Sequence, residues 1–425
     1  MTASKQCLLF AWLLLPQLLS AADPLPRPLT LEAALATADN ASHFELVRID
    51  ERYNALASEL GIEQGERGFS VDLKARLRQV GPSSRAAEDP TGDNAASLIF
   101  SKPIYDFGLA NSEEKLLLLQ LQALEVEKQA LIEKRRLSIM QKYFATLDAD
   151  NEFISENEAL AMGYIHFDRA RENRELGLEA DIEVMRLQAE YETTRQKRYL
   201  AEHQQRLTRS ILAEEMGHPD AIPSELLAPQ LEPRETPQLE LAPLVQQARE
   251  YSAEAKLMRL RTSAAQSLIR ISETSNNPRL DFEIELSTYE RETSTSDDWR
   301  VGLYFDMPLY SQSNSSRVSR ASARYHQALA EQQHFESKLR LQLLQLLQEI
   351  QQTRLLIEGT EIAQNYRELY LDRSRAEYEL EYKSDLGDSM VEYSRSNAAR
   401  LKALYAHELA FQRLVALVGP DFLER

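Results

Sequence analysis

The residues that could do chemistry in this chain are few and scattered. The chain has no glycine-rich phosphate loop, and its single cysteine is Cys7. Acidic residues are so frequent that chance carboxylate pairs do not indicate catalysis. The seven histidines form no metal-ligand spacing such as His-Glu-x-x-His; they are His43, His166, His203, His218, His326, His334 and His407. The sequence therefore predicts a protein that is not an enzyme and that uses no metal or other cofactor.

Residues 1–22 have the pattern of a secretory signal peptide. Lys5 supplies the positive start, Leu8–Leu15 the apolar core, and Ser20-Ala21-Ala22 the small residues before a cleavage site. Removing this segment changes the net charge from −18 to −18 − 1 = −19 and takes Cys7 with it. The mature chain is thus predicted to be exported and to have no thiol. Its negative charge argues against nucleic acid as a partner.

Four stretches alternate apolar and polar residues with a period of two, which is typical of β-strands. They cover about 69–80, 95–105, 279–289 and 299–310. In the third stretch, Leu280, Phe282 and Ile284 fall on one face, and Asp281, Glu283 and Glu285 on the other. An unbroken apolar face opposite an acidic face suits a sheet with lipid on one side and water on the other. From this pattern alone, a half-buried sheet of a water-soluble protein is an open alternative.

Most of the remaining chain has the Leu-, Glu-, Gln-, Arg- and Ala-rich composition of long packed helices. Helices are predicted from Leu29 to about Leu60, broken by Gly61, Gly65 and Gly68, and then over about 108–171, 181–216, 244–271, 316–377 and up to Val418. The stretch 108–171 has two apolar seams, which predicts helical neighbours on two sides. One seam is Ala123, Val126, Ala130, Leu137, Met140, Phe144 and Leu147, and the other is Leu117, Leu121, Leu124 and Leu131.

The order of strands and helices occurs twice. Residues 218–243 contain six of the 16 prolines and form a predicted linker between a first repeat, 23–217, and a second repeat, 244–425. Pro103-Ile104-Tyr105 and Pro308-Leu309-Tyr310 are 308 − 103 = 205 residues apart. Adding 205 to Gly177 reaches Tyr382, inside the second predicted helical break. The chain is therefore predicted to be an internal duplication.

Four strands cannot close a barrel, and open strand edges are prohibitive in lipid. Three copies would supply twelve strands and bring their long helices together in a tube. The predicted fold class is therefore mainly α with a small β part, in which a trimeric 12-stranded β-barrel continues into a long α-helical barrel.

At this point the pattern resembles the TolC-like outer-membrane efflux protein family, over essentially the whole mature chain. The resemblance is carried by three groups of residues: Leu29-Thr30-Leu31-Glu32-Ala33-Ala34-Leu35, the two Pro-x-Tyr strand ends, and Arg174-Glu175-Leu176-Gly177-Leu178-Glu179-Ala180-Asp181-Ile182-Glu183-Val184. It implies a homotrimer whose β-barrel lies in the bacterial outer membrane and whose helices extend into the periplasm. It also implies a periplasmic adaptor and an inner-membrane pump as partners.

The resemblance assigns roles to residues at the two helical breaks, which would form the periplasmic tips. Gly177 has to allow an unusual backbone angle in the first tip, and Arg174, Leu176, Gly177 and Leu178 are expected to face the adaptor. Glu183, Tyr378 and Lys383 are expected to close the gate, and Asp385 and Asp388 to form acidic rings in the pore. The second tip departs from the family pattern, because Glu381 replaces a glycine and Gly387-Asp388 stands where Asp-Val is usual.

The sequence therefore predicts the exit duct of a tripartite efflux pump or of a type I secretion system, through which a partner pump drives substrates. The alternative is a soluble periplasmic coiled-coil scaffold or adaptor, whose strands form a small packed domain.

Overall fold

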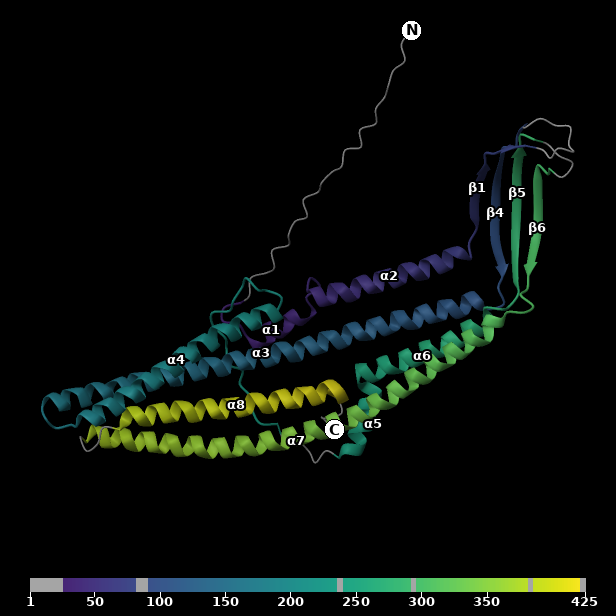
Figure 1. The fold of residues 1–425 in the computed structure, drawn as a ribbon. Coiled ribbons are helices and arrows are strands. Elements are labelled where there is room, and N and C mark those ends of the chain that lie inside the picture. The colour runs from purple at the N-terminus through teal and green to yellow at the C-terminus, as the bar shows by residue number, and fades with distance from the viewer. Residues whose placement is uncertain (1–25, 82–90, 235–239, 292–295, 381–384, 421–425) are drawn as a thin grey trace, which may run out of the picture.

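The structure, a computed structural model, describes residues 26–81, 91–234, 240–291, 296–380 and 385–420. They form a long rod of helices with a sheet at one end (Figure 1). The helices are α1 (Leu31–Leu35), α2 (Phe44–Glu66), α3 (Leu109–Glu175), α4 (Asp181–Glu215), α5 (Leu241–Tyr251), α6 (Ala253–Thr274), α7 (Gln312–Glu379) and α8 (Leu386–Val418), with a 3-10 turn, η1, at Ala36–Asp39. The strands are β1 (Ser70–Arg76), β2 (Gln79–Val80), β3 (Thr91–Gly92), β4 (Ala95–Tyr105), β5 (Arg279–Tyr289) and β6 (Trp299–Asp306).

Two long helices, α3 and α7, set the length of the rod. The 67 residues of α3 extend for about 100 Å at the rise of an α-helix. Helix α2 packs on the half of α3 near the sheet and α4 on the other half, and α6 and α8 pack on α7 in the same way (Figure 1). Because α3 also contacts α6 and α8, it has neighbours on two sides, as its two seams predict.

The two repeats follow each other in register. Helix α4 begins at Asp181 and α8 at Leu386, an offset of 386 − 181 = 205 residues. The predicted fold of one chain, mainly helical with a small sheet and built by duplication, is therefore confirmed.

The seam of α7 forms the core of the second repeat. Its buried residues are Leu339, Leu343, Leu346, Ile350, Thr353 and Ile357. Of these, Leu339, Leu343 and Ile350 pack with α5 and the end of α8. In α3, Met140, Phe144 and Leu147 of one seam and Leu117, Leu121 and Leu124 of the other are buried. No helix within the described residues combines the length and apolar character needed to cross a membrane.

A cluster halfway along the rod fixes the start of the described chain and the linker onto α3. Leu29 and Leu226 form a parallel bridge, and the buried Tyr143 hydroxyl lies 2.8 Å from the carbonyl oxygen of Leu29 and 2.6 Å from that of Leu227. Burial raises the pKa of Tyr143 to about 12. The fully buried Arg135 guanidinium donates to the carbonyl oxygens of Ala38 and Glu215, so one side chain ties η1 and the end of α4 to α3.

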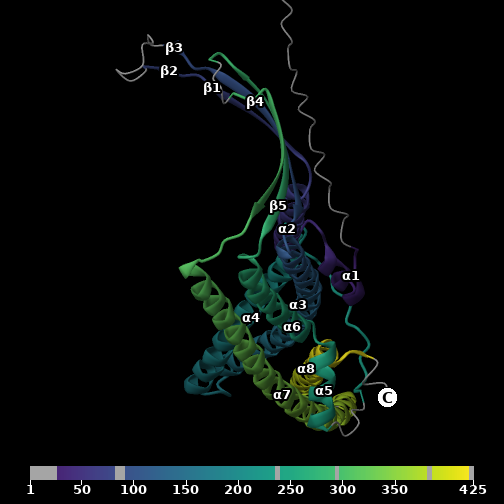
Figure 2. The ribbon, with the colours of Figure 1, turned by 90° about the vertical axis from the view of Figure 1, so that its right-hand side faces the viewer.

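The four main strands form one antiparallel sheet in the order β1-β4-β5-β6, and the sheet is strongly curved (Figure 2). The β4–β5 pair joins the two repeats. Two strands are shorter than predicted. The first ends at Arg76 because Asn94 Oδ1 accepts the Arg78 amide, and the chain continues as the separate β2–β3 ribbon. The last ends at Asp306, two residues before Pro308, which has no N–H to donate.

Two helix predictions were wrong in their bounds. Helix α2 continues through Gly61 and Gly65 to Glu66, because glycine inside a helix costs only about 1 kcal/mol and α2 packs on α3. The helix predicted from Leu29 is interrupted before α2, where His43 Nδ1 caps the new helix by accepting from Glu45. The helix predicted over 244–271 is divided at Ser252, and its first part begins at Leu241, inside the predicted linker. Pro243 is tolerated in the first turn of α5, because the backbone N–H groups of a first turn have no carbonyl partner within the helix.

Candidate functional site

The sheet has an apolar face that is more exposed than its polar face. Val71, Phe100, Ile284 and Val301 form one cross-strand row, and Leu73, Leu98, Leu286 and Trp299 form the next. Leu73 exposes 73% of its surface and Leu303 67%, whereas the Glu285 side chain on the other face exposes only 16%. A sheet that packs on a protein core would show the reverse, so the outer face suits an apolar surrounding.

The polar face is held together by its own contacts. Arg300 pairs with Glu285 at 3.1 Å across β5 and β6. The Ser97 and Ser287 hydroxyls lie 2.8 Å apart across β4 and β5, and Ser287 also donates to Glu285. The charges on this face are therefore paired across neighbouring strands, as on a wall that faces water.

The chain has two open edges along its whole length. In the sheet, β1 and β6 are the edge strands. The packed helices run α2–α3–α6–α7 near the sheet and α4–α3–α8–α7 at the far end, so the first repeat supplies one edge and α7 the other. A head-to-tail ring of copies would place β1 beside β6, and α2 and α4 beside α7.

Both helical edges carry exposed apolar side chains. On α7, Leu355, Ile362 and Leu369 are seven residues apart and expose 68%, 71% and 71% of their surface. On α4, Leu200 and Leu207 repeat the same spacing and are also exposed. A seven-residue repeat is the spacing by which two helices pack as a coiled coil, and both edges carry it.

The first tip is the turn between α3 and α4, and its backbone follows from Gly177. This residue has φ +75°, in the left-handed region that glycine adopts without strain. The Leu178 amide donates to the Asn173 carbonyl at 2.8 Å and the Gly177 amide to the Arg174 carbonyl at 2.9 Å, which ends α3. The unusual angle predicted at Gly177 is confirmed.

The side chains of this first tip point outward. Leu176 exposes 72% of its surface and Leu178 74%, and Ile182 on the first turn of α4 exposes 78%. Arg174 forms an ion pair with Asp181 across the turn. Of the residues predicted to face an adaptor, Leu176 and Leu178 therefore form an exposed apolar surface at the end of the rod, beside the ion-paired Arg174.

The second tip lies between α7 and α8. The structure describes it up to Leu380 and again from Asp385, so Glu381 and Lys383 lie outside the described residues. Asp385 precedes α8 and accepts a hydrogen bond from the Tyr370 hydroxyl at 3.1 Å. Asp388, in the first turn of α8, lies 3.0 Å from His166 Nε2 on α3. Each of the two predicted ring acids thus has a partner within its own chain.

The predicted gate residues Glu183 and Tyr378 are not brought together within one chain. Glu183 lies on α4, where it binds Arg186, and this hydrogen bond lowers the pKa of the Glu183 carboxyl. Tyr378, exposed by 55%, lies on α7 at the opposite end of the row of helices. Only neighbouring copies in a ring could place these two residues side by side.

The contact between His166 and Asp388 was missed by sequence reasoning. The two residues are 222 positions apart, on helices of different repeats. No local pattern marks the histidine, so only the packing of α3 on α8 reveals it.

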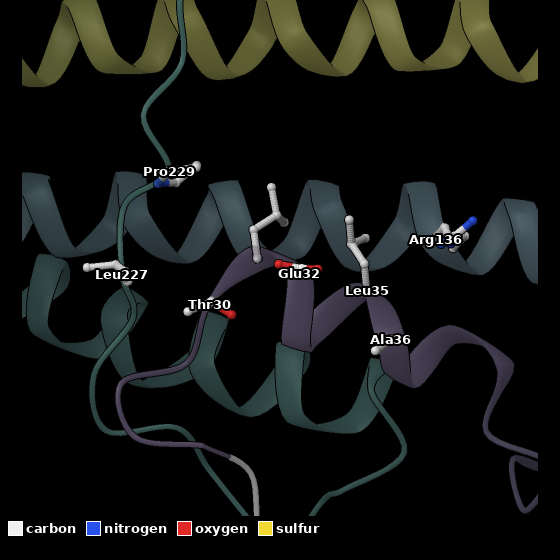
Figure 3. Close-up of a pocket in the computed structure, with 8 residues that line it drawn as sticks. Thr30, Glu32, Leu35, Ala36, Arg136, Leu227 and Pro229 are labelled. Carbon is white, nitrogen blue, oxygen red and sulfur yellow. The ribbon is translucent and has the colours of Figure 1, made fainter. Parts of the chain in front are cut away.

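A groove of about 560 Å³ lies beside α1, near the middle of the rod. Leu227 and Pro229 of the linker line one end and Arg136 of α3 the other, with Glu32 and Leu35 of α1 between them (Figure 3). It is mainly apolar and holds no convergent set of titratable groups. Among the described residues, no group of three or more His, Cys, Asp or Glu side chains is arranged to hold a metal ion.

One partly buried acid lies between the repeats. Asp148 of α3 faces α8. One turn before it, Phe144 of α3 stacks on Tyr405 of α8 with ring centroids 4.8 Å apart. Its Oδ1 atom is buried without a hydrogen bond to the described protein. Burial raises the pKa of Asp148 to about 6 against the attraction of Lys402, and burial also raises the pKa of Tyr405 to about 12.

The chain is a rod of two repeated helical units that ends in an open-edged sheet with an exposed apolar face. The fold is shared with solved outer-membrane proteins. The outer membrane protein VceC of Vibrio cholerae matches with a TM-score of 0.70 and 18% identity, over 92% of this chain and 96% of that one. The CmeC outer membrane channel of Campylobacter jejuni matches with a TM-score of 0.75 and 15% identity, over 92% and 85%.

The open state of the MtrE outer membrane channel of Neisseria gonorrhoeae gives a TM-score of 0.72 at 14% identity, over 92% and 88%. At such identities the likeness establishes a common fold along nearly the whole chain. No family model matches the sequence. No curated protein matches it either.

Proposed function

We propose that this protein is a TolC-like outer-membrane channel, the passive exit duct of a tripartite efflux pump or a type I secretion system. The observation that carries the proposal is the inverted sheet, whose apolar face is exposed while its charged face is paired and partly covered. A sheet of this kind is stable when lipid covers its outer face and copies of the chain close its edges. The duct carries no reaction of its own, since its partner pump does the work.

The channel is a homotrimer, in which three four-stranded sheets make twelve strands and the helical edges meet between copies. The supporting observations are the edge strands β1 and β6 and the matching seven-residue seams of α4 and α7. In such a ring, Glu183 of one copy approaches Tyr378 of the next; Lys383, the third predicted gate residue, lies outside the described residues. The exposed tip at Arg174, Leu176, Gly177 and Leu178 docks a periplasmic adaptor, and Asp385 and Asp388 border the pore.

The test combines fractionation, mass and conductance. The mature protein is expected in the outer-membrane fraction, to have three times the chain mass in detergent, and to form channels in planar bilayers. A protein that remains soluble as a monomer or dimer and conducts no ions would refute the duct. That result would instead support the periplasmic scaffold.

The gate is tested separately by the double variant Glu183→Ala, Tyr378→Phe. Removing both partners is expected to raise the conductance of single channels, because the tips lose a contact between copies. Glu192→Ala, on the same helix but paired locally with Arg195, is the matched control. Unchanged conductance in the double variant would rule out this gate assignment but leave the duct standing.

A further inference from the structure

The two repeats are joined near the tip by side chains of α3 and α8. His166 Nε2 lies 3.0 Å from both carboxylate oxygens of Asp388. One turn away, a Cβ atom on Gly387 would collide with the sulfur of Met162, so the start of α8 lies directly against α3. Farther from the tip, Arg395 of α8 pairs with Glu156 of α3 at 3.1 Å.

The other charged groups around this contact have partners of their own. On α8, Asp385 accepts from Tyr370 of α7, and Glu392 pairs with Arg367 of α7 at 3.1 Å. On α3, Asp168 pairs with Arg171. Arg169, three residues after His166, also has an interaction of its own. Helix α4 contributes Tyr191, which packs on Tyr164 and Phe167. Among the described residues, Asp388 is joined to α3 by its side-chain contact with His166.

We propose that His166 and Asp388 form a pH-sensitive latch that holds α8 against α3 beside the tip, tightest in acid and weakest above neutral pH. This inference rests on the proposed channel, because releasing the latch lets the two helical hairpins separate where the duct opens.

The sign follows from imidazole chemistry. Histidine changes charge between about pH 5 and 8. The protonated ring forms a charge-assisted contact with the carboxylate, whereas the neutral ring keeps at most one ordinary hydrogen bond. Because the pair is partly exposed, protonation is expected to change the equilibrium constant between the closed and the released latch by a factor of about two to five in each copy. Three copies that open together would multiply this to roughly tenfold to hundredfold.

The first test measures the latch without reference to conduction. Because Cys7 leaves with the predicted signal segment, the mature chain allows spin labels at Ile165→Cys and Met390→Cys alone, and both positions are exposed. Between pH 5.5 and 8, the population with the short label distance is expected to fall severalfold in the otherwise unchanged trimer. With His166→Gln added, which cannot gain a charge, the population is expected to be independent of pH. The same pH dependence in both proteins would overturn the latch.

The second test is the opening frequency in planar bilayers over the same pH range. It is expected to rise about tenfold toward pH 8 in the native chain and to stay flat in His166→Gln and in Asp388→Asn. His334→Gln is the matched control, because His334 lies on α7 about 70 Å along the helix from the tip. Retained pH dependence in His166→Gln contradicts the latch. If no protein conducts while the label distances respond to pH, the duct fails and the latch stands.

Discussion

The helical rod and the sheet place their apolar side chains differently. In the rod, Leu343 and Ile139 are completely buried between helices, and acidic and basic residues cover the outside. In the sheet, Leu73 and Leu303 expose most of their surface, while Glu285 and Asp281 lie on the more covered face. The rod therefore buries a core within one chain and exposes apolar seams at its α4 and α7 edges, whereas the sheet leaves a whole apolar face for a surrounding that one chain does not provide.

The largest expected effect is in the buried part of the rod. Leu343→Ala removes a fully buried side chain between α7 and its neighbours and is expected to lower the free energy of unfolding by about 2–5 kcal/mol. Leu303→Ala, on the outer face of the sheet, is expected to cost about 1 kcal/mol or less in detergent. Chemical denaturation followed by circular dichroism measures both. Equal losses would mean that the sheet face packs on protein as the rod does.

The next effect concerns the two faces of β6. Leu303→Arg places a charge on the outer face near the middle of the strand, where lipid would make it cost about 2–4 kcal/mol. Tyr304→Arg, one residue on, places the same charge on the polar face. The amount of protein in the outer-membrane fraction is expected to fall strongly for the first variant and little for the second. If both variants behave alike, the outer face does not contact lipid.

Asp148 is a partly buried acid within the rod, and burial raises its pKa from 3.8 to about 6. The folded protein then binds this proton more tightly than the unfolded chain, so stability is expected to increase as the pH falls from 7 toward 4. Asp148→Asn is expected to stabilise the protein at pH 8, by about 1–2 kcal/mol after allowance for solvent screening of this partly exposed group, and to have little effect at pH 4. Thermal unfolding at the two pH values measures the difference. A stabilisation that does not depend on pH would contradict burial as the cause.

The smallest effect distinguishes a glycine that the tip needs from one that a helix merely tolerates. Gly177→Ala places an L side chain at φ +75° and is expected to cost about 1–2 kcal/mol locally. The amides at the end of α3 would then exchange their hydrogens faster. Gly359→Ala lies inside α7 with open space around its Cβ position, and it is expected to stabilise that helix by about 0.5–1 kcal/mol. Slower exchange in Gly177→Ala would show that the turn does not depend on a left-handed residue.

Local patterns predicted those parts of the molecule that depend on neighbours in sequence. The alternation of Leu280 to Leu286 marked β5 and its two faces, and Gly177 marked the end of α3, because both features arise within a few residues. Helix bounds were less predictable. Gly61 and Gly65 look like breaks, but packing on α3 outweighs their small intrinsic penalty.

The sequence by itself determined the strands, the long helices, their duplication and the two-faced pattern of the sheet, since periodicity and composition act over short distances. Only the tertiary structure decided that the apolar face of the sheet is the more exposed one, that Glu183 and Tyr378 lie on opposite edges, that Asp148 is partly buried between the repeats, and that His166 meets Asp388. These contacts join residues far apart in the chain. Their geometry depends on how α3, α4, α7 and α8 pack, which no local pattern encodes.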